Sequence, residues 1–366
     1  FEGGFLGMDN ISVFDRSDAV PPGHRLEQSD ATSWMAVYCL AMLDIALELA
    51  RVDSAYDDLA TKFLEHFVAI GVAAQTFGSG NVTLWDEEDG FCYDTLIAGD
   101  HCSPVRIRSM VGLIPLMACS VLPPEVTARA PDFAARLAWL ERHRPADLAR
   151  VLTRHGDGTI LLSLLDEPKL ARVLRRMLDE AEFLSPYGLR ALSAYHREHP
   201  YQIEVEGVTA SIDYEPAEST TPMFGGNSNW RGPLWFPLNY LVISALERYR
   251  RFFGDDFTIE YPTGSGAQVT LDKVAADLQD RLIALFTRSP DGRRPCFGGN
   301  ERLQDDPAWR DNIVFGEYFH GDNGAALGAS HQTGWTGLIA DVIRRRYGQV
   351  RSVGEIVRII EQEHRA

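Results

Sequence analysis

The sequence lacks the cysteine patterns that build disulfide frameworks and structural zinc sites. It has no Cys-x-x-Cys pair and no histidine at zinc-ligand spacing from a cysteine. Its five cysteines are scattered along the chain, at Cys39, Cys92, Cys102, Cys119 and Cys296. Cys39 and Cys119 lie in apolar runs, which is typical of inert buried thiols. We therefore expect no disulfide framework and no structural zinc site. We expect no other metal site and no organic cofactor either.

Positive charge is also scarce. Lys and Arg together number 35 against 52 Asp and Glu, which gives a formal net charge of −17. The field of such a chain repels nucleic acid and acidic membrane surfaces, so we predict neither as a partner. A small neutral carbohydrate is not repelled and is compatible with this charge. The charge does not indicate an oligomeric state.

Long hydrophobic runs and several common motifs are absent as well. Charged residues interrupt each apolar run short of the roughly 20 residues that a membrane span needs, and no signal peptide is visible. We therefore expect a cytoplasmic protein. The sequence has no Gly-x-Ser-x-Gly elbow, P-loop or dinucleotide fingerprint, which argues against acyl and phosphoryl transfer.

The chain has 366 residues, 45% of them hydrophobic, and this is enough to bury a substantial core. We predict a single domain over residues 1–366. The chain starts at Phe1 and reaches a motif-like segment within a few residues. We therefore expect it to be the C-terminal part of a longer polypeptide.

Apolar residues recur at three- to four-residue spacing over residues 30–51 and again over 54–75. This period predicts two amphipathic helices joined as a hairpin. The same spacing predicts further helices at about 104–120, 131–143, 168–181, 186–197, 233–253, 270–288, 332–347 and 352–364. Many helices joined by long, uneven loops favour an all-α helical toroid over a bundle, with short β-hairpins on the loops.

Two carboxylates differ from the other acidic residues in their surroundings. Asp9 lies in a Gly-Met-Asp-Asn segment, and Glu317 lies between Gly316 and Tyr318 in a stretch rich in Gly and aromatics. Most of the 52 acidic residues must be surface charges, but these two do not lie among Lys and Arg on a helical face. A general acid and a general base that face each other across a sugar require such a pair.

Trp230, Arg231 and Trp235 surround Pro233, which is a favoured first-turn residue of a helix. Indole faces stack on pyranose rings, and a guanidinium donates forked hydrogen bonds to hydroxyls. We therefore predict these three residues as substrate contacts. The alternative is a structural aromatic cluster. The Gly- and Asn-rich residues 225–229 favour the first interpretation, because a flexible polar loop is poor core material.

Three further residues are candidates for the same cleft. Trp85 precedes an acidic turn at residues 86–89, which is either a hard-cation site or, as the spacing favours, a solvated loop. His331 and Trp335 lie near a predicted helix start, and His331 would either support the site or contact the sugar. We predict Trp85, His331 and Trp335 as further substrate contacts.

Five motif-like segments occur in order along the chain. They lie within residues 7–10, 84–94, 185–193, 230–235 and 334–337. Together they resemble glycoside hydrolase family 63, which includes processing α-glucosidase I, bacterial α-glucosidases and mannosylglycerate hydrolases. The resemblance spans nearly the whole chain, and the ordered set is far more specific than any single segment.

The resemblance implies a glycoside hydrolase catalytic domain with an (α/α)6 barrel and an inverting mechanism. In it, Asp9 would be the general acid and Glu317 the general base. It also implies that several helices precede the acid, whereas almost nothing precedes Asp9 here. The barrel is therefore expected to be incomplete on its N-terminal side. Residues 11–13, Ile-Ser-Val, depart from the family's Ser-Pro-Arg-like turn, which leaves the identity of the substrate open.

These observations predict an inverting glycosidase that acts on α-linked glucosides or related short oligosaccharides. Asp9 would protonate the leaving oxygen, which requires a raised pKa, and Glu317 would take a proton from water. Room for that water predicts a separation of roughly 6.5–9.5 Å between the two carboxyl groups. Two alternatives stay open: a trehalase-like hydrolase, because the Trp-Arg-Gly-Pro stretch resembles that family too, and a catalytically inactive carbohydrate-binding toroid.

Overall fold

The fold is mainly helical. The computed structural model describes residues 7–8, 10–15, 20–75, 83–221 and 228–348. The described residues include eleven α-helices: α1 Ser29–Leu49, α2 Ala55–Gln75, α3 Ile114–Met117, α4 Pro124–Ala128, α5 Pro131–His143, α6 Pro145–Leu148, α7 Glu167–Met177, α8 Phe236–Phe253, α9 Leu271–Ala284, α10 Glu301–Asp305 and α11 Ile339–Tyr347. The helix predicted at 352–364 lies outside the described residues.

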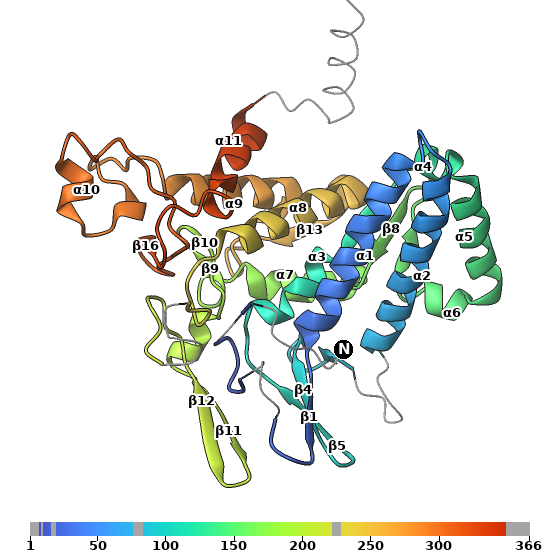
Figure 1. The fold of residues 1–366 in the computed structure, drawn as a ribbon, viewed down its shortest axis with the longest axis horizontal. Helices are drawn as coiled ribbons and strands as arrows, with labels where there is room; N and C mark the ends of the chain where they lie inside the picture. Colours follow the sequence, from blue (N-terminus) through green and yellow to red (C-terminus); the bar gives the residue numbers. More distant parts are fainter. Residues whose placement is uncertain (1–6, 9, 16–19, 76–82, 222–227, 349–366) are drawn as a thin grey trace, which may run out of the picture.

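The first two helices form the expected hairpin, side by side in Figure 1. Their contact is a core of buried side chains that includes Leu43 and Phe67. Gly71 permits a close approach, because a Cβ there would lie 2.0 Å from Cγ1 of Val151. Helix α5 packs on α2, and the Asp57 carboxylate of α2 accepts two hydrogen bonds of 2.9 Å from backbone N–H groups in the first turn of α5. These N–H groups have no partner within their own helix, so the carboxylate caps α5.

Helices α8, α9 and α11 form a second layered group (Figure 1). Helix α8 follows Trp235, has a proline in its first turn and ends at Gly254, whose φ of +63° suits glycine. The last turn of α11 is fixed to α9 by a fork of hydrogen bonds of 2.9 and 2.8 Å from Arg346 to Asp280. Helix α8 also packs on α3, which joins this group to the centre of the molecule.

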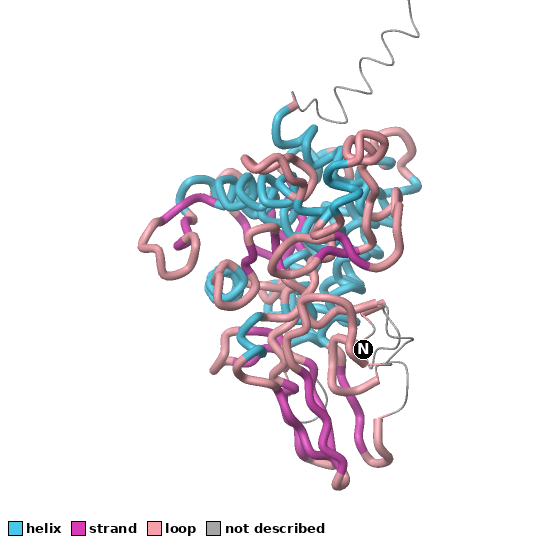
Figure 2. The backbone as a smooth tube through the Cα atoms, turned by 90° about the vertical axis from the view of Figure 1, so that its left-hand side faces the viewer, coloured by secondary structure: helices cyan, strands magenta, loops and turns pink. Residues whose placement is uncertain are grey.

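In the described residues the strands are short, and every strand pair is antiparallel. Two sheets have three strands: β1 His24–Glu27, β4 Asp94–Ala98 and β5 His101–Val105 in one, and β6 Cys119–Leu122, β8 Ile160–Ser163 and β7 Leu152–Arg154 in the other. Five hairpins complete the set: β2 Trp85–Asp86 with β3 Phe91–Cys92, β9 Leu184–Ser185 with β10 Gly188–Leu189, β11 Tyr201–Val205 with β12 Val208–Ile212, β13 Thr258–Glu260 with β14 Gln268–Thr270, and β15 Tyr318–Phe319 with β16 Ala326–Leu327. Figures 1 and 2 place β4–β5 and β11–β12 at the same end of the molecule.

Two predicted helices are wrong. Residues 104–120 contain the end of β5, a turn of 3-10 helix, the single turn of α3 and the start of β6. Nearly all side chains over residues 109–122 are buried, and a continuous apolar run does not distinguish a strand from a helix. Residues 186–197 contain β10 and a 3-10 turn. A φ of +135° at Gly188 and a hydrogen bond of 2.7 Å from Leu189 N to the Asn239 side chain replace helical geometry there.

Helix α1 meets the length and composition of a membrane span, contrary to the sequence-based expectation that no run would. In the structure it packs against α2 and α3 and carries three acidic residues. Burial raises the pKa of one of them, Asp44, which accepts a hydrogen bond of 2.6 Å from Ser120. A buried core helix passes the same test of length and composition. The described residues are compatible with a helical toroid, and they hold more strand than an all-α fold predicts.

We expect Leu43→Ala to lower the free energy of unfolding by about 2–5 kcal/mol, because it leaves a cavity in the α1–α2 core. Ile45→Ala on the same helix is the matched control, since that side chain is 52% exposed, and it should change stability by about 1 kcal/mol or less. Urea titration of both variants measures the difference. Equal losses would show that the α1–α2 contact does not form this core.

Candidate active site

Glu317 precedes β15 and is half-buried. Its backbone is held on one side by the β15–β16 hairpin, and Phe319 two residues later forms an isolated bridge with Leu234. This bridge places the start of α8 next to the hairpin. One carboxylate oxygen, Oε2, accepts a hydrogen bond of 2.8 Å from the backbone N–H of Ala329. The predicted general base therefore lies at a hairpin edge with one oxygen fixed.

The predicted aromatic contacts form a stack next to this hairpin. The rings of Trp230 and Trp235 are parallel with centroids 3.7 Å apart, and Tyr318 stacks on the far side of Trp235 at 4.8 Å. Trp335 meets Trp235 edge-on at 6.1 Å. Trp230 and Trp235 are only 4% and 2% exposed, whereas Trp335 is 37% exposed. Of these tryptophans, Trp335 therefore offers an indole surface that a ligand can reach.

Tyr318 carries its hydroxyl into a negatively charged neighbourhood. Burial, followed by the charges of Glu218 and Glu317, raises the pKa of Tyr318 to about 12. The phenol is therefore neutral over the physiological pH range. Its ring is fully buried and stacks on Trp235, so it forms a rigid wall beside the Glu317 carboxylate.

Arg231 is 4% exposed, and its guanidinium is used inside the protein. Its Nε donates a hydrogen bond of 2.7 Å to the backbone oxygen of Asn10. One terminal nitrogen donates a hydrogen bond of 3.4 Å to the backbone oxygen of Ser12. The other terminal nitrogen of Arg231 lies 3.7 Å from Oε1 of Glu215. Burial lowers the pKa of Arg231, and Glu215 partly compensates for it. These bonds hold the segment after residue 9; a direct sugar contact by Arg231 stays a prediction.

Asn10 and Asn229, which the sequence reading did not select, join the same segments. Asn10 accepts a hydrogen bond of 2.7 Å from the backbone N–H of Trp230, and its amide donates 3.0 Å to the side chain of Asn229. The Asn229 amide in turn donates to the backbone oxygens of Glu215 and Ala217 at 2.8 and 2.7 Å. Asp9 itself lies outside the described residues, so its predicted role and its separation from Glu317 stay predictions.

A second polar group that the sequence reading missed surrounds Asp322. One carboxylate oxygen of Asp322 accepts from Tyr214 at 2.9 Å and from Arg190 at 3.2 Å, and the other accepts from Arg197 at 2.7 Å. Burial acts to raise the pKa of Asp322, but the Tyr214 hydrogen bond and the two arginines outweigh it and lower the pKa. The group fixes the tip of the β15–β16 hairpin. The only sequence signal was that Arg190 lies within the motif at 185–193.

His331 is exposed and has a φ of +61°, a backbone conformation that is uncommon for residues other than glycine. Its ring stacks on Phe315 with centroids 5.8 Å apart. The left-handed conformation is strained for residues other than glycine, and it persists only where the surrounding structure holds it. Such residues are found more often at active sites and ligand-binding sites. His331 and Trp335 stay predicted sugar contacts, and both are exposed.

Trp85 belongs to the same large core cluster as Trp230 and Trp235. It is buried, and the guanidinium of Arg172 from α7 lies 5.4 Å from its ring centroid. Among the described residues, no ring contact joins Trp85 to the Trp230 stack. The acidic turn after Trp85 is neutralised by arginines, with nitrogen–oxygen distances of 2.7–3.3 Å. In the part of the chain that the structure describes, no group of three His, Cys, Asp or Glu is placed to hold a metal ion.

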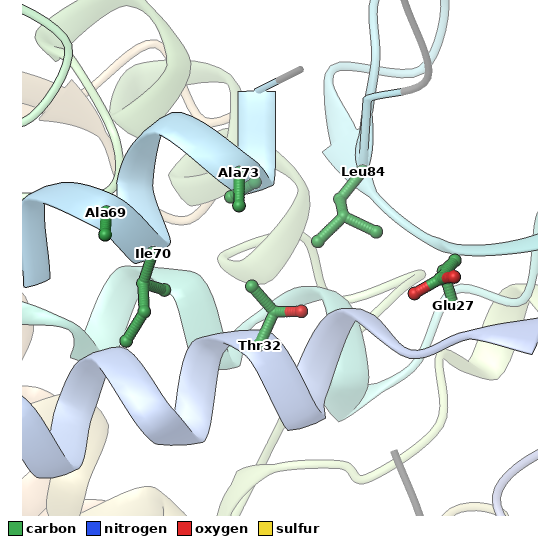
Figure 3. Close-up of a pocket in the computed structure, with 7 residues that line it drawn as sticks. Glu27, Thr32, Ala69, Ile70, Ala73 and Leu84 are labelled. Atoms are coloured by element: carbon green, nitrogen blue, oxygen red, sulfur yellow. The ribbon is translucent and has the colours of Figure 1, made fainter. Parts of the chain in front are cut away.

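The cavity drawn in Figure 3 has a volume of about 280 Å³ and lies between α1 and α2. Its lining is mainly apolar: Glu27, Thr32, Ala69, Ile70, Ala73, Ala74 and Leu84. None of the predicted site residues lines it. A sugar requires several polar groups around its hydroxyls, and this cavity has few, so its chemistry differs from that of the Glu317 region.

A family model described as "Mannosylglycerate hydrolase MGH1-like glycoside hydrolase domain" matches residues 19–336. An uncharacterized protein of Saccharomyces cerevisiae is 46% identical over 357 residues, which is 93% of this chain and 33% of that protein. A probable mannosyl-oligosaccharide glucosidase of Schizosaccharomyces pombe is 24% identical over 51% of this chain and 17% of its own length. The mannosyl-oligosaccharide glucosidase of Saccharomyces cerevisiae is 24% identical over 49% of this chain and 16% of its own length. The chain thus spans a third or less of these relatives.

Two solved structures align over most of the chain. A sialidase aligns over 83% of this chain and 18% of its own, with 14% identity and a TM-score of 0.41. A mannosylglycerate hydrolase of glycoside hydrolase family 63 from Thermus thermophilus, solved with glucose, aligns over 84% of this chain and 42% of its own, with 16% identity and a TM-score of 0.33. Both scores lie below 0.5, and neither likeness establishes the fold.

We expect Asn229→Ala to lower the free energy of unfolding by roughly 3 kcal/mol, because it leaves several buried polar groups without partners. Asn323→Ala is the control: Asn323 is exposed at the tip of the β15–β16 hairpin, and the loss should be within about 0.5 kcal/mol. Urea unfolding of both variants provides the comparison. A wild-type midpoint for Asn229→Ala would show that the bonds to Asn10 and to residues 215–217 do not support the fold.

Proposed function

We propose that this chain, a member of the mannosylglycerate hydrolase MGH1-like glycoside hydrolase family, hydrolyses α-linked glucosides or related short oligosaccharides with inversion at the anomeric carbon. The observation that carries the proposal is the Glu317 carboxylate within the matched region. It is half-buried beside a rigid aromatic wall, with one oxygen anchored by a backbone N–H. A general base requires this arrangement, because its position must be fixed before the substrate arrives.

In the proposed reaction Glu317 takes a proton from water while that water attacks the anomeric carbon. Asp9 gives a proton to the glycosidic oxygen as the bond to the aglycone breaks. The products are a free sugar of inverted configuration and an alcohol. The hydrogen bonds of Arg231, Asn10 and Asn229 support this assignment, because they hold the segment next to residue 9 against the start of α8.

We further propose that the sugar packs against Trp335 and His331, which are the exposed aromatic groups beside the Glu317 segment. An indole face and an imidazole ring suit the apolar face of a pyranose. The proposed scaffold is an (α/α)6 barrel to which the described helices contribute. The names of two relatives contain "mannosyl-oligosaccharide glucosidase", which supports glucose as the sugar that is released.

Replacing Glu317 with Gln should reduce kcat by about 10²- to 10⁴-fold, because the amide keeps the volume and cannot accept the proton of the attacking water. KM should change little. Glu301→Gln, on the exposed first turn of α10, is the control and should leave kcat unchanged. Steady-state kinetics with the best substrate from a set of α-glucosides and α-mannosides measures both. Wild-type kcat in Glu317→Gln would remove Glu317 from the mechanism.

Proton NMR of the first-formed sugar from an α-glucoside should show the β anomer before mutarotation. Inversion follows if water attacks from the face opposite the leaving group. Appearance of the α anomer first would show retention through a covalent intermediate and contradict the proposed roles. Binding of the same glucosides without any hydrolysis would instead identify a carbohydrate-binding domain.

A further inference from the structure

The strand that faces Glu317 contains one extra residue. Leu327 pairs with Tyr318, so regular pairing would place Gly328 opposite Glu317. Instead, the backbone N–H of Glu317 donates 3.0 Å to the oxygen of Ala329. Two residues of this strand, Gly328 and Ala329, therefore lie opposite the single residue Glu317. Gly328 has a φ of +68°. This is a β-bulge with glycine in the left-handed conformation, a device that redirects side chains next to active sites.

The bulge acts directly on the carboxylate. Because Gly328 turns the chain, the N–H of Ala329 points back and donates 2.8 Å to Oε2 of Glu317. A Cβ added at Gly328 would lie 2.6 Å from that same oxygen and 2.6 Å from Cε1 of Tyr318. Non-bonded atoms do not approach so closely, so a Cβ at position 328 could not keep this place beside both groups.

The Tyr318 ring resists displacement. It is fully buried and stacks on Trp235 at 4.8 Å, and Trp235 stacks in turn on Trp230 at 3.7 Å. Displacing the ring would disturb a packed core, which costs more than rotating a half-exposed side chain. Residue 328 would therefore have to shift away from the ring. This shift, together with the contact with Oε2, would break the hydrogen bond between the Ala329 N–H and the Glu317 carboxylate.

We propose that Gly328 is a positioning residue for the general base, and that Oε1 of Glu317 is the oxygen that takes the proton from water. Oε2 is held by Ala329, while among the described residues no hydrogen bond to Oε1 is present. The water oxygen bonds to the anomeric carbon, its proton goes to Oε1, and the glycosidic oxygen leaves with the proton of the general acid. This inference rests on the function proposed above.

The test is Gly328→Ala with Gly207→Ala as the matched control. Gly207, at the β11–β12 turn, has a φ of +78° and no atom within 4 Å of an added Cβ. Both variants therefore bear the same kind of backbone strain, but only the alanine at position 328 meets the carboxylate and the Tyr318 ring. We expect kcat of Gly328→Ala to fall about 100-fold with KM within about threefold of wild type, and Gly207→Ala to keep wild-type kinetics. A crystal structure of Gly328→Ala should show Oε2 displaced from Ala329.

A second arm separates positioning of the base from general damage. In a Glu317→Ala background, azide can replace the activated water and give a β-glycosyl azide without a base. There is then no carboxylate to displace, so adding Gly328→Ala should leave the azide-dependent rate unchanged. A further 100-fold loss in that background, or wild-type kcat in Gly328→Ala alone, would overturn the inference and leave the proposed function standing. Absence of hydrolysis by the wild-type protein would overturn both.

Discussion

The side chain of Asn229 joins three stretches of chain, because its amide nitrogen bonds to one of them and its amide oxygen to the other two. Its amide nitrogen reaches two backbone oxygens in residues 215–217, and its amide oxygen accepts from Asn10 and from the backbone of Arg231. Only a carboxamide supplies donors and acceptors in this combination. The position of the Trp230–Trp235 stack relative to the N-terminal segment depends on it, and so does the distance from that segment to the Glu317 hairpin.

Several polar and aromatic side chains near Glu317 are buried. Three of them are nearly inaccessible to solvent: Trp230, Arg231 and Trp235. They lie in the segment that pairs with the Glu317 hairpin through Leu234 and Phe319. Buried, closely packed groups of this kind hold neighbouring side chains in fixed positions, which catalysis by positioning requires. The accessible surface is left to the Glu317 carboxylate, Trp335 and His331.

Sequence reasoning reached the family and the helices with strong periodicity. The ordered motifs predicted glycoside hydrolase family 63, and the match over residues 19–336 confirms it. The α1–α2 hairpin is confirmed because one face of each helix is buried and the period is therefore visible. Residues 104–120 were misassigned because a run buried on all sides has no period. Asn229, Asp322 and Gly328 were not selected because their importance depends on pairing register and on distant partners, which spacing along the chain does not encode.

The bond between Asn10 and Asn229 also bears on the order in which the protein assembles. It spans 219 residues, whereas the contact between Glu317 and Ala329 spans 12. The entropy lost on closing a loop grows as the logarithm of its length, so the long closure costs about 2–3 kcal/mol more than the short one. The hairpin with the base can form early from local contacts, while the N-terminal segment docks only once α8 is in place. A partly unfolded chain would thus hold a folded Glu317 hairpin before residues 10 and 229 meet.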